Sequence, residues 1–236
     1  MNKKQQDDLV TMYNQGWAGV LENGCEDFGD LDASLLFINR LDIPKESKIL
    51  EIGCAVGNLC NELSKMNFTD ITGIDISDAA INYGKNKYPH LNISSYEGIN
   101  LNFSDETFDI LLSFDVVEHI TDIDSHFQEA VKILRPSGRY IFQTPNILSN
   151  SVFETIRCKG KMTWKRYHPS LQFSFSLKKK LMQSGFKRVE FVKISPLTEY
   201  KLVSIPIILR YMLKIIPWTF LPVWLQTNFF VIAYKR

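Results

Sequence analysis

The segment from Ile49 to Gly57, Ile-Leu-Glu-Ile-Gly-Cys-Ala-Val-Gly, joins a short apolar strand to a turn that has a glycine at each end. A helical segment, 58–66, follows the turn at once. Glycine tolerates tight backbone conformations and lets a ligand approach the main chain closely. The segment therefore predicts the first strand, turn and helix of an α/β sheet, with a binding site at the carboxyl end of the strand.

The alternation of strand and helix continues along the chain, which is the pattern of a parallel sheet with helices on both faces. The expected strands are 48–52, 70–75, 92–96, 108–113, 139–144, 187–194 and 228–234. The expected helices are 58–66, 77–87, 122–134 and 175–184. Ser77 is placed to cap the second of these helices, Ser137-Gly138 to turn into the fifth strand, and Gly185 to end the last helix.

Residues 1–45 are expected to form a helical cap ahead of a domain that spans 46–236, so that the 236-residue chain is effectively one domain. An apolar stripe in this cap consists of Leu35, Leu36, Ile38 and Leu41. The polar amino terminus does not resemble a secretory signal, and four scattered cysteines suggest neither a disulfide framework nor a zinc site. A cytoplasmic location is the expectation.

Three residues around the glycine turn indicate which cofactor it binds. Glu51 lies next to the last residue of the strand, and Ala55 occupies the middle position of the turn, where dinucleotide enzymes have a second glycine. A carboxylate there repels a pyrophosphate but attracts an ammonium group. Asp75, at the end of the next strand, is placed to accept hydrogen bonds from ribose hydroxyls. A nicotinamide-dependent oxidoreductase is therefore the weaker alternative.

With these features the sequence resembles the class I S-adenosylmethionine-dependent methyltransferases over about 45–195 and the final strand. Residues 51–57, 73–77, 96–98, 108–119 and 134–138 are similar to successive motifs of that family. The resemblance implies a Rossmann-like, doubly wound, seven-stranded sheet with an antiparallel last strand, and S-adenosylmethionine as cofactor. It implies the cofactor-binding residues Glu51, Gly53, Cys54, Ala55, Gly57, Asp75, Ile76, Glu97, Gly98, Ser113 and Phe114.

His119 is the candidate catalytic base, because it follows the fourth strand and an imidazole titrates near neutral pH. The alternative is a structural histidine at a helix start. Asp115, Glu118 and His119 resemble the acidic pair and histidine of ubiquinone-pathway O-methyltransferases, although Asp115 replaces a glutamate. That subgroup associates these residues with a divalent cation, but we expect no metal in this chain.

Two pairs of residues are candidates for the acceptor side of the site. Tyr13 and Trp17 lie four residues apart and would share one helical face, either closing over the substrates or simply packing. Tyr167 and His168 precede a Phe-Ser step into the next helix, as in a loop of the family. They form either a wall of the acceptor site or a capping loop.

The insert at 197–226 is the feature most specific to this chain. Its apolar part, 202–225, is interrupted by Arg210 and Lys214 and divided by three prolines, so a straight membrane-spanning helix is disfavoured. We consider a substrate lid or packing element first, then contact with a membrane surface, then an oligomer interface.

The sequence therefore predicts an enzyme that methylates an oxygen or nitrogen atom of a small-molecule, quinone-like, sugar or lipid-linked acceptor. A noncatalytic nucleoside-binding regulator on the same fold is the alternative from another functional class. Nucleic acid is not expected as a partner, because the net charge is +1 and the chain lacks the Pro-Pro-aromatic motif of many amino-directed enzymes.

Overall fold

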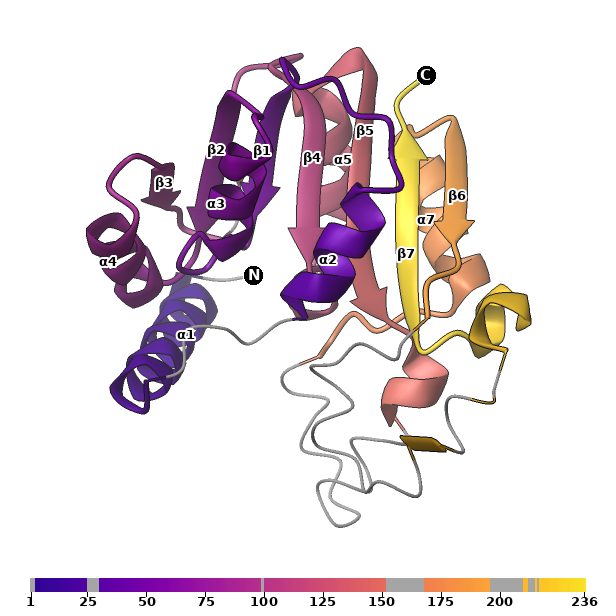
Figure 1. Cartoon of the computed structure of the whole chain (residues 1–236), viewed down its shortest axis with the longest axis horizontal. Coiled ribbons are helices and arrows are strands. Elements are labelled where there is room, and N and C mark those ends of the chain that lie inside the picture. Colours follow the sequence, from indigo (N-terminus) through magenta and orange to yellow (C-terminus); the bar gives the residue numbers. More distant parts are fainter. Residues whose placement is uncertain are drawn as a thin grey trace.

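A computed structural model describes residues 3–24, 30–98, 100–151, 168–195, 210–211, 215 and 217–236. Its centre is a single sheet of seven strands in the order β3-β2-β1-β4-β5-β7-β6 (Figure 1). The strands are β1 (Lys48–Ile52), β2 (Asp70–Asp75), β3 (Asn92–Ser95), β4 (Phe108–Phe114), β5 (Leu134–Pro145), β6 (Arg188–Val192) and β7 (Asn228–Tyr234).

Strands β1 to β5 pair in parallel, and β7 pairs antiparallel with both β5 and β6. The predicted sheet, with its antiparallel last strand, is therefore confirmed. Because the order reverses between β1 and β4, the carboxyl ends of these two strands form the edge at which such sheets bind ligands.

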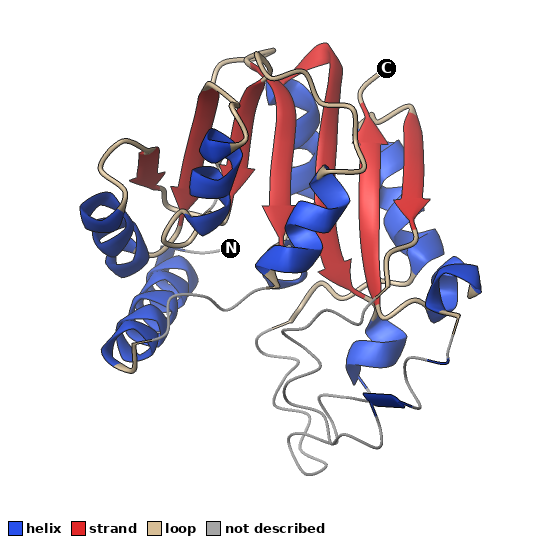
Figure 2. Cartoon of the chain, in the orientation of Figure 1, coloured by secondary structure: helices blue, strands red, loops and turns tan. Residues whose placement is uncertain are grey.

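The principal helices are α1 (Lys3–Glu22), α2 (Leu31–Ile38), α3 (Asn58–Lys65), α4 (Asp78–Lys87), α5 (Ile123–Ile133) and α7 (Ser174–Ser184). Figure 2 shows α2 and α3 in front of the sheet and α5 and α7 behind it. Each face buries its own apolar cluster. Phe37 of α2 and Leu63 of α3 belong to the front cluster, and Phe127 of α5 and Leu181 of α7 belong to the rear cluster.

The predicted helix ends have the expected chemistry. The Ser77 side chain accepts a hydrogen bond from the Ala80 N–H at the start of α4, and Gly185 ends α7 at a φ of 116°. The predicted apolar stripe of the cap was only partly right. Ile38 is buried, but Leu36 is 40% exposed, and Phe37 has no exposed surface. Packing of α2 on Phe114 and Phe230 decides which side of this short helix is covered.

Strand β5 begins at Leu134, five residues earlier than predicted, and includes Ser137-Gly138 in place of a separate turn. Leu134 pairs with Phe108 and Arg139 with Ile110, so the pairing register shifts between them. The Arg135 guanidinium lies 2.8 Å from a carboxylate oxygen of Asp109, which holds the irregular stretch against β4. The predicted turn is thus a bulge within a continuous strand.

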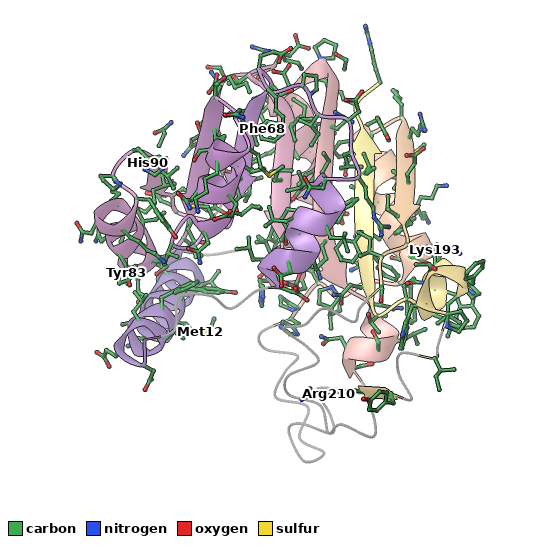
Figure 3. The ribbon with its side chains drawn as sticks, in the orientation of Figure 1. Met12, Phe68, Tyr83, His90, Lys193 and Arg210 are labelled. Atoms are coloured by element: carbon green, nitrogen blue, oxygen red, sulfur yellow. The ribbon has the colours of Figure 1, made fainter. Side chains whose placement is uncertain are left out.

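Helix α1 packs against α4 beside the glycine turn. The Asn14 side-chain oxygen accepts hydrogen bonds from the Ser77 hydroxyl and the Ala79 N–H, at 3.0 and 3.1 Å. Trp17 is buried in a cluster with Val56 of the turn and Ala80 of α4. Tyr83, where α4 meets α1, packs on the same cluster (Figure 3). Helix α1, the first part of the predicted cap, therefore covers the turn.

Gly84 tests how tightly α4 is packed on this turn. A Cβ at Gly84 would lie 2.4 Å from the Val56 carbonyl oxygen, whereas one at Gly19 of α1 would meet nothing within 4 Å. We expect Gly84→Ala to reduce the free energy of unfolding by about 1–3 kcal/mol. Gly19→Ala should increase it by about 0.5–1 kcal/mol, because alanine suits a helix interior better. Urea unfolding of both variants would measure this, and an unchanged Gly84→Ala midpoint would contradict the described packing.

Candidate functional site

The turn after β1 has the backbone conformation of a ligand cradle. Gly53 and Gly57 have φ values of 77° and 85°, and Ala55 between them has a φ of 51°. The Gly53 and Cys54 N–H groups donate to the Ile74 carbonyl of β2, which fixes the turn against the neighbouring strand. A side chain at Gly53 would collide with Val116, because a Cβ there would lie 2.3 Å from its Cγ2 atom. The turn thus needs glycine at this position.

Asp75 ends β2 beside the turn and is buried. One carboxylate oxygen accepts the Ala55 N–H and the other accepts the Ser77 N–H, both at 2.8 Å. Burial raises the pKa of Asp75, while these backbone hydrogen bonds act to lower it. Each carboxylate oxygen has capacity for more than one hydrogen bond, so the group can hold the loop and still accept hydroxyl donors.

Glu51 lies at the carboxyl end of β1 and is buried on the side of α3. The Cys60 thiol donates a hydrogen bond to its Oε2 atom at 2.8 Å. Burial and the neighbouring Glu51 carboxylate raise the pKa values of Cys60 and Cys54 well above the usual range, so both remain thiols. A buried carboxylate at this position matches a cationic group better than a phosphate.

Residues 96–98, which include the predicted cofactor-binding residues Glu97 and Gly98, lie alongside Asp75 and Ile76. The Tyr96 N–H donates to the Asp75 carbonyl at 3.0 Å. Gly98 has a φ of 77°, and a Cβ there would lie 2.6 Å from the Ile76 side chain. The glycine therefore lets the loop that contains Glu97 approach β2 closely.

Ser113 and Phe114, the two predicted cofactor-binding residues at the end of β4, point to opposite faces of the sheet. The Ser113 hydroxyl lies 2.8 Å from the Tyr140 hydroxyl, which is 2.9 Å from Nε2 of His126 on α5. Burial lowers the pKa of His126 to about 4, so this buried chain of hydrogen bonds is neutral. The Phe114 ring instead lies against Phe37 of α2. Only the backbone of Ser113 is therefore suited to contact a cofactor at the sheet edge.

A tight turn follows β4 and contains the candidate base. Asp115 has a φ of 54°, and Val117–His119 form a short 3₁₀ helix. Glu118 is buried, and its Oε2 atom accepts a hydrogen bond from the Thr144 hydroxyl at 2.9 Å. Its other oxygen, Oε1, lies 4.0 Å from Nε2 of His119, whose side chain is 27% exposed. Burial, with a contribution from Asp115, raises the pKa of Glu118 well above its usual range.

Asp115, Glu118 and His119 do not gather as metal ligands. Within the described ranges, no group of three or more histidine, cysteine, aspartate or glutamate side chains has an arrangement that could hold a metal ion.

Three candidate residues from distant parts of the chain meet at this turn. The His119 ring lies 5.9 Å from the Tyr13 ring of α1 and 4.9 Å from the His168 ring, measured between centroids. Burial and the carboxylates of Glu118 and Asp75 raise the pKa of Tyr13, so its phenol stays protonated. We call Tyr13, His119 and His168 the ring cluster. It extends the site from the glycine turn toward the ends of β4 and β5.

The segment that contains His168 is fastened to the His119 turn. The Ser170 N–H donates to the Glu118 carbonyl at 3.1 Å, and the Ser170 hydroxyl donates to the Ile120 carbonyl. The His168 Nδ1 atom lies 3.3 Å from the side-chain oxygen of Asn150. His168 therefore lies beside His119, a position that suits either the acceptor-site wall or the capping loop expected at 167–168, and Tyr167 lies outside the described residues.

Most of the apolar insert also lies outside the described residues. Its last part forms two short 3₁₀ helices, Trp218–Phe220 and Val223–Leu225. The Asn146 side chain, just after β5, donates to the carbonyls of Trp224 and Gln226, which fixes this part beside the site edge. In the part of the chain that the structure describes, no helix combines the length and apolarity needed to cross a bilayer.

Three polar residues that the sequence did not predict shape the site. Asn14 fastens α1 to α4, Thr144 holds Glu118, and Gln143 accepts the Asp115 N–H on its side-chain oxygen at 3.2 Å. None of them belongs to a spaced motif, so only their position in the folded chain reveals their contacts.

Comparison with known proteins agrees with this geometry. Residues 28–190 match a family model described as a methyltransferase domain. The ubiquinone biosynthesis O-methyltransferase of Bartonella tribocorum is 31% identical over 133 residues, which cover 55% of this chain and 51% of that protein. This chain thus aligns with about half the length of that relative.

Two solved structures have the same fold. An S-adenosylmethionine-dependent methyltransferase from Mesorhizobium loti superposes with a TM-score of 0.62 at 16% identity, covering 87% of this chain and 100% of that chain. Phosphoethanolamine N-methyltransferase 2 of Haemonchus contortus, bound to phosphomonomethylethanolamine and S-adenosylhomocysteine, superposes with a TM-score of 0.61 at 17% identity. It covers 86% of this chain and 52% of that chain.

The family match extends over more than half of the chain, and the sheet order and glycine turn are those expected for such a domain. The chain therefore belongs to the methyltransferase domain family, the class I methyltransferases whose cofactor is S-adenosylmethionine.

Proposed function

We propose that this chain transfers a methyl group from S-adenosylmethionine to an oxygen or nitrogen atom of a small-molecule acceptor, with His119 accepting the proton. The observation that supports this most is the ring cluster. Tyr13, His119 and His168 come from three separate segments and meet beside a turn suited to a nucleoside. The relatives include both O- and N-methyltransferases, which fits either kind of acceptor atom.

In this proposal the residues around the glycine turn bind the cofactor. Glu51 attracts its ammonium group, Asp75 accepts hydrogen bonds from its ribose hydroxyls, and the loop with Glu97 and Gly98 lies against its adenine. The backbone at Gly53 and Gly57 lets the cofactor approach closely, because these two residues have no side chains. When bound, S-adenosylmethionine supplies a methyl group that is already activated by the sulfonium charge.

The protein's own tasks are then to align the acceptor, exclude water and remove a proton. The exposed part of His119 makes it reachable, while Tyr13 and His168 restrict the movement of its ring. The buried Glu118 carboxyl lies 4.0 Å from Nε2 of His119, which is beyond hydrogen-bond distance, so the proton-accepting role is given to His119 alone. His126 is fully engaged in the core and neutral, which makes it a poor alternative base.

The other acceptor-side predictions have different support. Trp17 is buried against Val56 and Ala80, so packing of α1 is its evident role. Contact of 202–225 with a membrane or a lipid-linked acceptor stays a prediction. It has indirect support from Phe220 and Trp224, which are 84% and 55% exposed at the end of the insert.

Asp75→Asn tests the ribose role. The amide keeps an oxygen for only one of the two backbone N–H groups, and it loses the charge that strengthens hydrogen bonds from hydroxyls. We expect the affinity for S-adenosylmethionine, measured by calorimetry, to fall roughly 10- to 100-fold. The control is Asp78→Asn, an exposed carboxylate in the first turn of α4, which should bind normally. Equal affinity of the two variants would remove Asp75 from the cofactor site.

His119→Ala tests the base. Transfer from labelled S-adenosylmethionine to a panel of phenols and amines should slow by roughly 10²- to 10⁴-fold, because a general base contributes about that factor. Binding of the methyl donor should not change. The control is His90→Ala, which removes an exposed histidine near β3 (Figure 3). Turnover of His119→Ala at the wild-type rate would show that His119 is structural.

A further inference from the structure

Gln143 is buried at the carboxyl end of β5, with 4% of its surface exposed. It pairs with Phe114 of β4 on one side and Phe230 of β7 on the other. Its Nε2 atom is the one buried side-chain nitrogen or oxygen atom of the described residues that has no hydrogen-bond partner. Buried amide groups are nearly always paired, so an orphaned donor at this edge calls for an explanation.

The orientation of this amide follows from its other end. The Asp115 N–H donates to both the Oε1 atom and the backbone carbonyl of Gln143, at 3.2 Å each. Exchanging the amide oxygen and nitrogen would place two donors against each other. The free N–H group is therefore Nε2, and the bond to Asp115 fixes where it lies.

Asp115 connects Gln143 to the glycine turn that binds the cofactor and to the turn that contains His119. The next residue, Val116, packs on Gly53 of the cofactor turn, and its carbonyl accepts the His119 N–H at 2.9 Å. Gln143 is thus one hydrogen bond away from the turn that touches the cofactor cradle and contains the candidate base.

We propose that Gln143 Nε2 donates a hydrogen bond to an oxygen atom of the methyl acceptor. This inference rests on the proposed methyl transfer and narrows its substrate class. The ring cluster suits a planar, aromatic acceptor. The orphaned N–H group of Gln143 indicates a second feature of the acceptor: a carbonyl or hydroxyl oxygen next to the hydroxyl or amine that is methylated. A site built to pair with such an oxygen rejects analogues that lack it, because the buried N–H then stays unpaired.

The first test is stability without substrates. Gln143→Met removes the orphaned donor, and the Asp115 N–H keeps the backbone carbonyl, so Tm should stay equal or rise. The matched control is Gln226→Met. The buried Gln226 Nε2 donates to the carbonyls of Trp218 and Leu221, at 2.7 and 3.1 Å. Its loss should lower Tm by roughly 2–4 °C. An equal loss of Tm in Gln143→Met would overturn the proposal, because the amide would then be structural.

The second test is binding, followed by the ¹⁵N side-chain signals of Gln143 in protein saturated with S-adenosylhomocysteine. The probes are 2-hydroxyacetophenone, whose hydroxyl stands beside a carbonyl, and 2-ethylphenol, which has a similar shape without the carbonyl. The first should move the Gln143 signals and bind Gln143→Met about tenfold more weakly. The second should bind both proteins equally.

Signals that do not move with 2-hydroxyacetophenone, or equal binding of that probe to both proteins, would overturn the proposal. Weaker binding of S-adenosylhomocysteine to Gln143→Met would also overturn it, because the amide would then contact the cofactor. Failure of the wild-type protein to bind S-adenosylhomocysteine would refute the proposed function instead, and the stability comparison would still decide whether the Gln143 amide is structural.

Discussion

The Asp75 carboxylate is the contact on which the rest of the site depends. Its two oxygens accept backbone N–H groups from Ala55 in the glycine turn and from Ser77 at the start of α4. One buried side chain thereby fixes β1's turn, β2 and α4 relative to one another. Asn14 then fastens α1 to the same corner, and α1 brings Tyr13 to His119. The ring cluster therefore forms only when the contacts of Asp75 and Asn14 hold the glycine turn, α4 and α1 together.

Burial gives the polar groups of the site their chemical states. The pKa values of Glu118 and Tyr13 are raised by burial, while that of His126 is lowered to about 4. Near neutral pH the phenol is a donor and His126 is neutral. His119, at 27% exposure, keeps contact with the outside of the site. Depth therefore separates the buried His126 from His119, the proposed base at the edge of the sheet.

The sequence predicted the sheet well because its strands and turns are specified locally. The glycine turn, the Ser77 cap and the Gly185 helix end follow from backbone chemistry that neighbouring residues determine. The predicted start of β5 was wrong, because a contact with Asp109 determines it. The predicted buried side of α2 was incomplete, because a contact with Phe230 determines it. Gln143 had no signal at all, since an orphaned amide exists only once β4 and β5 are paired.

The buried carboxylate beside the turn between Gly53 and Gly57 favours a sulfonium nucleoside over a dinucleotide. Calorimetric titration of the unmodified protein with S-adenosylmethionine, S-adenosylhomocysteine and NADH distinguishes these two kinds of ligand. The buried Glu51 carboxylate predicts binding of the first two compounds and rejection of the pyrophosphate of NADH. Preferential binding of NADH would show that the turn binds a dinucleotide instead.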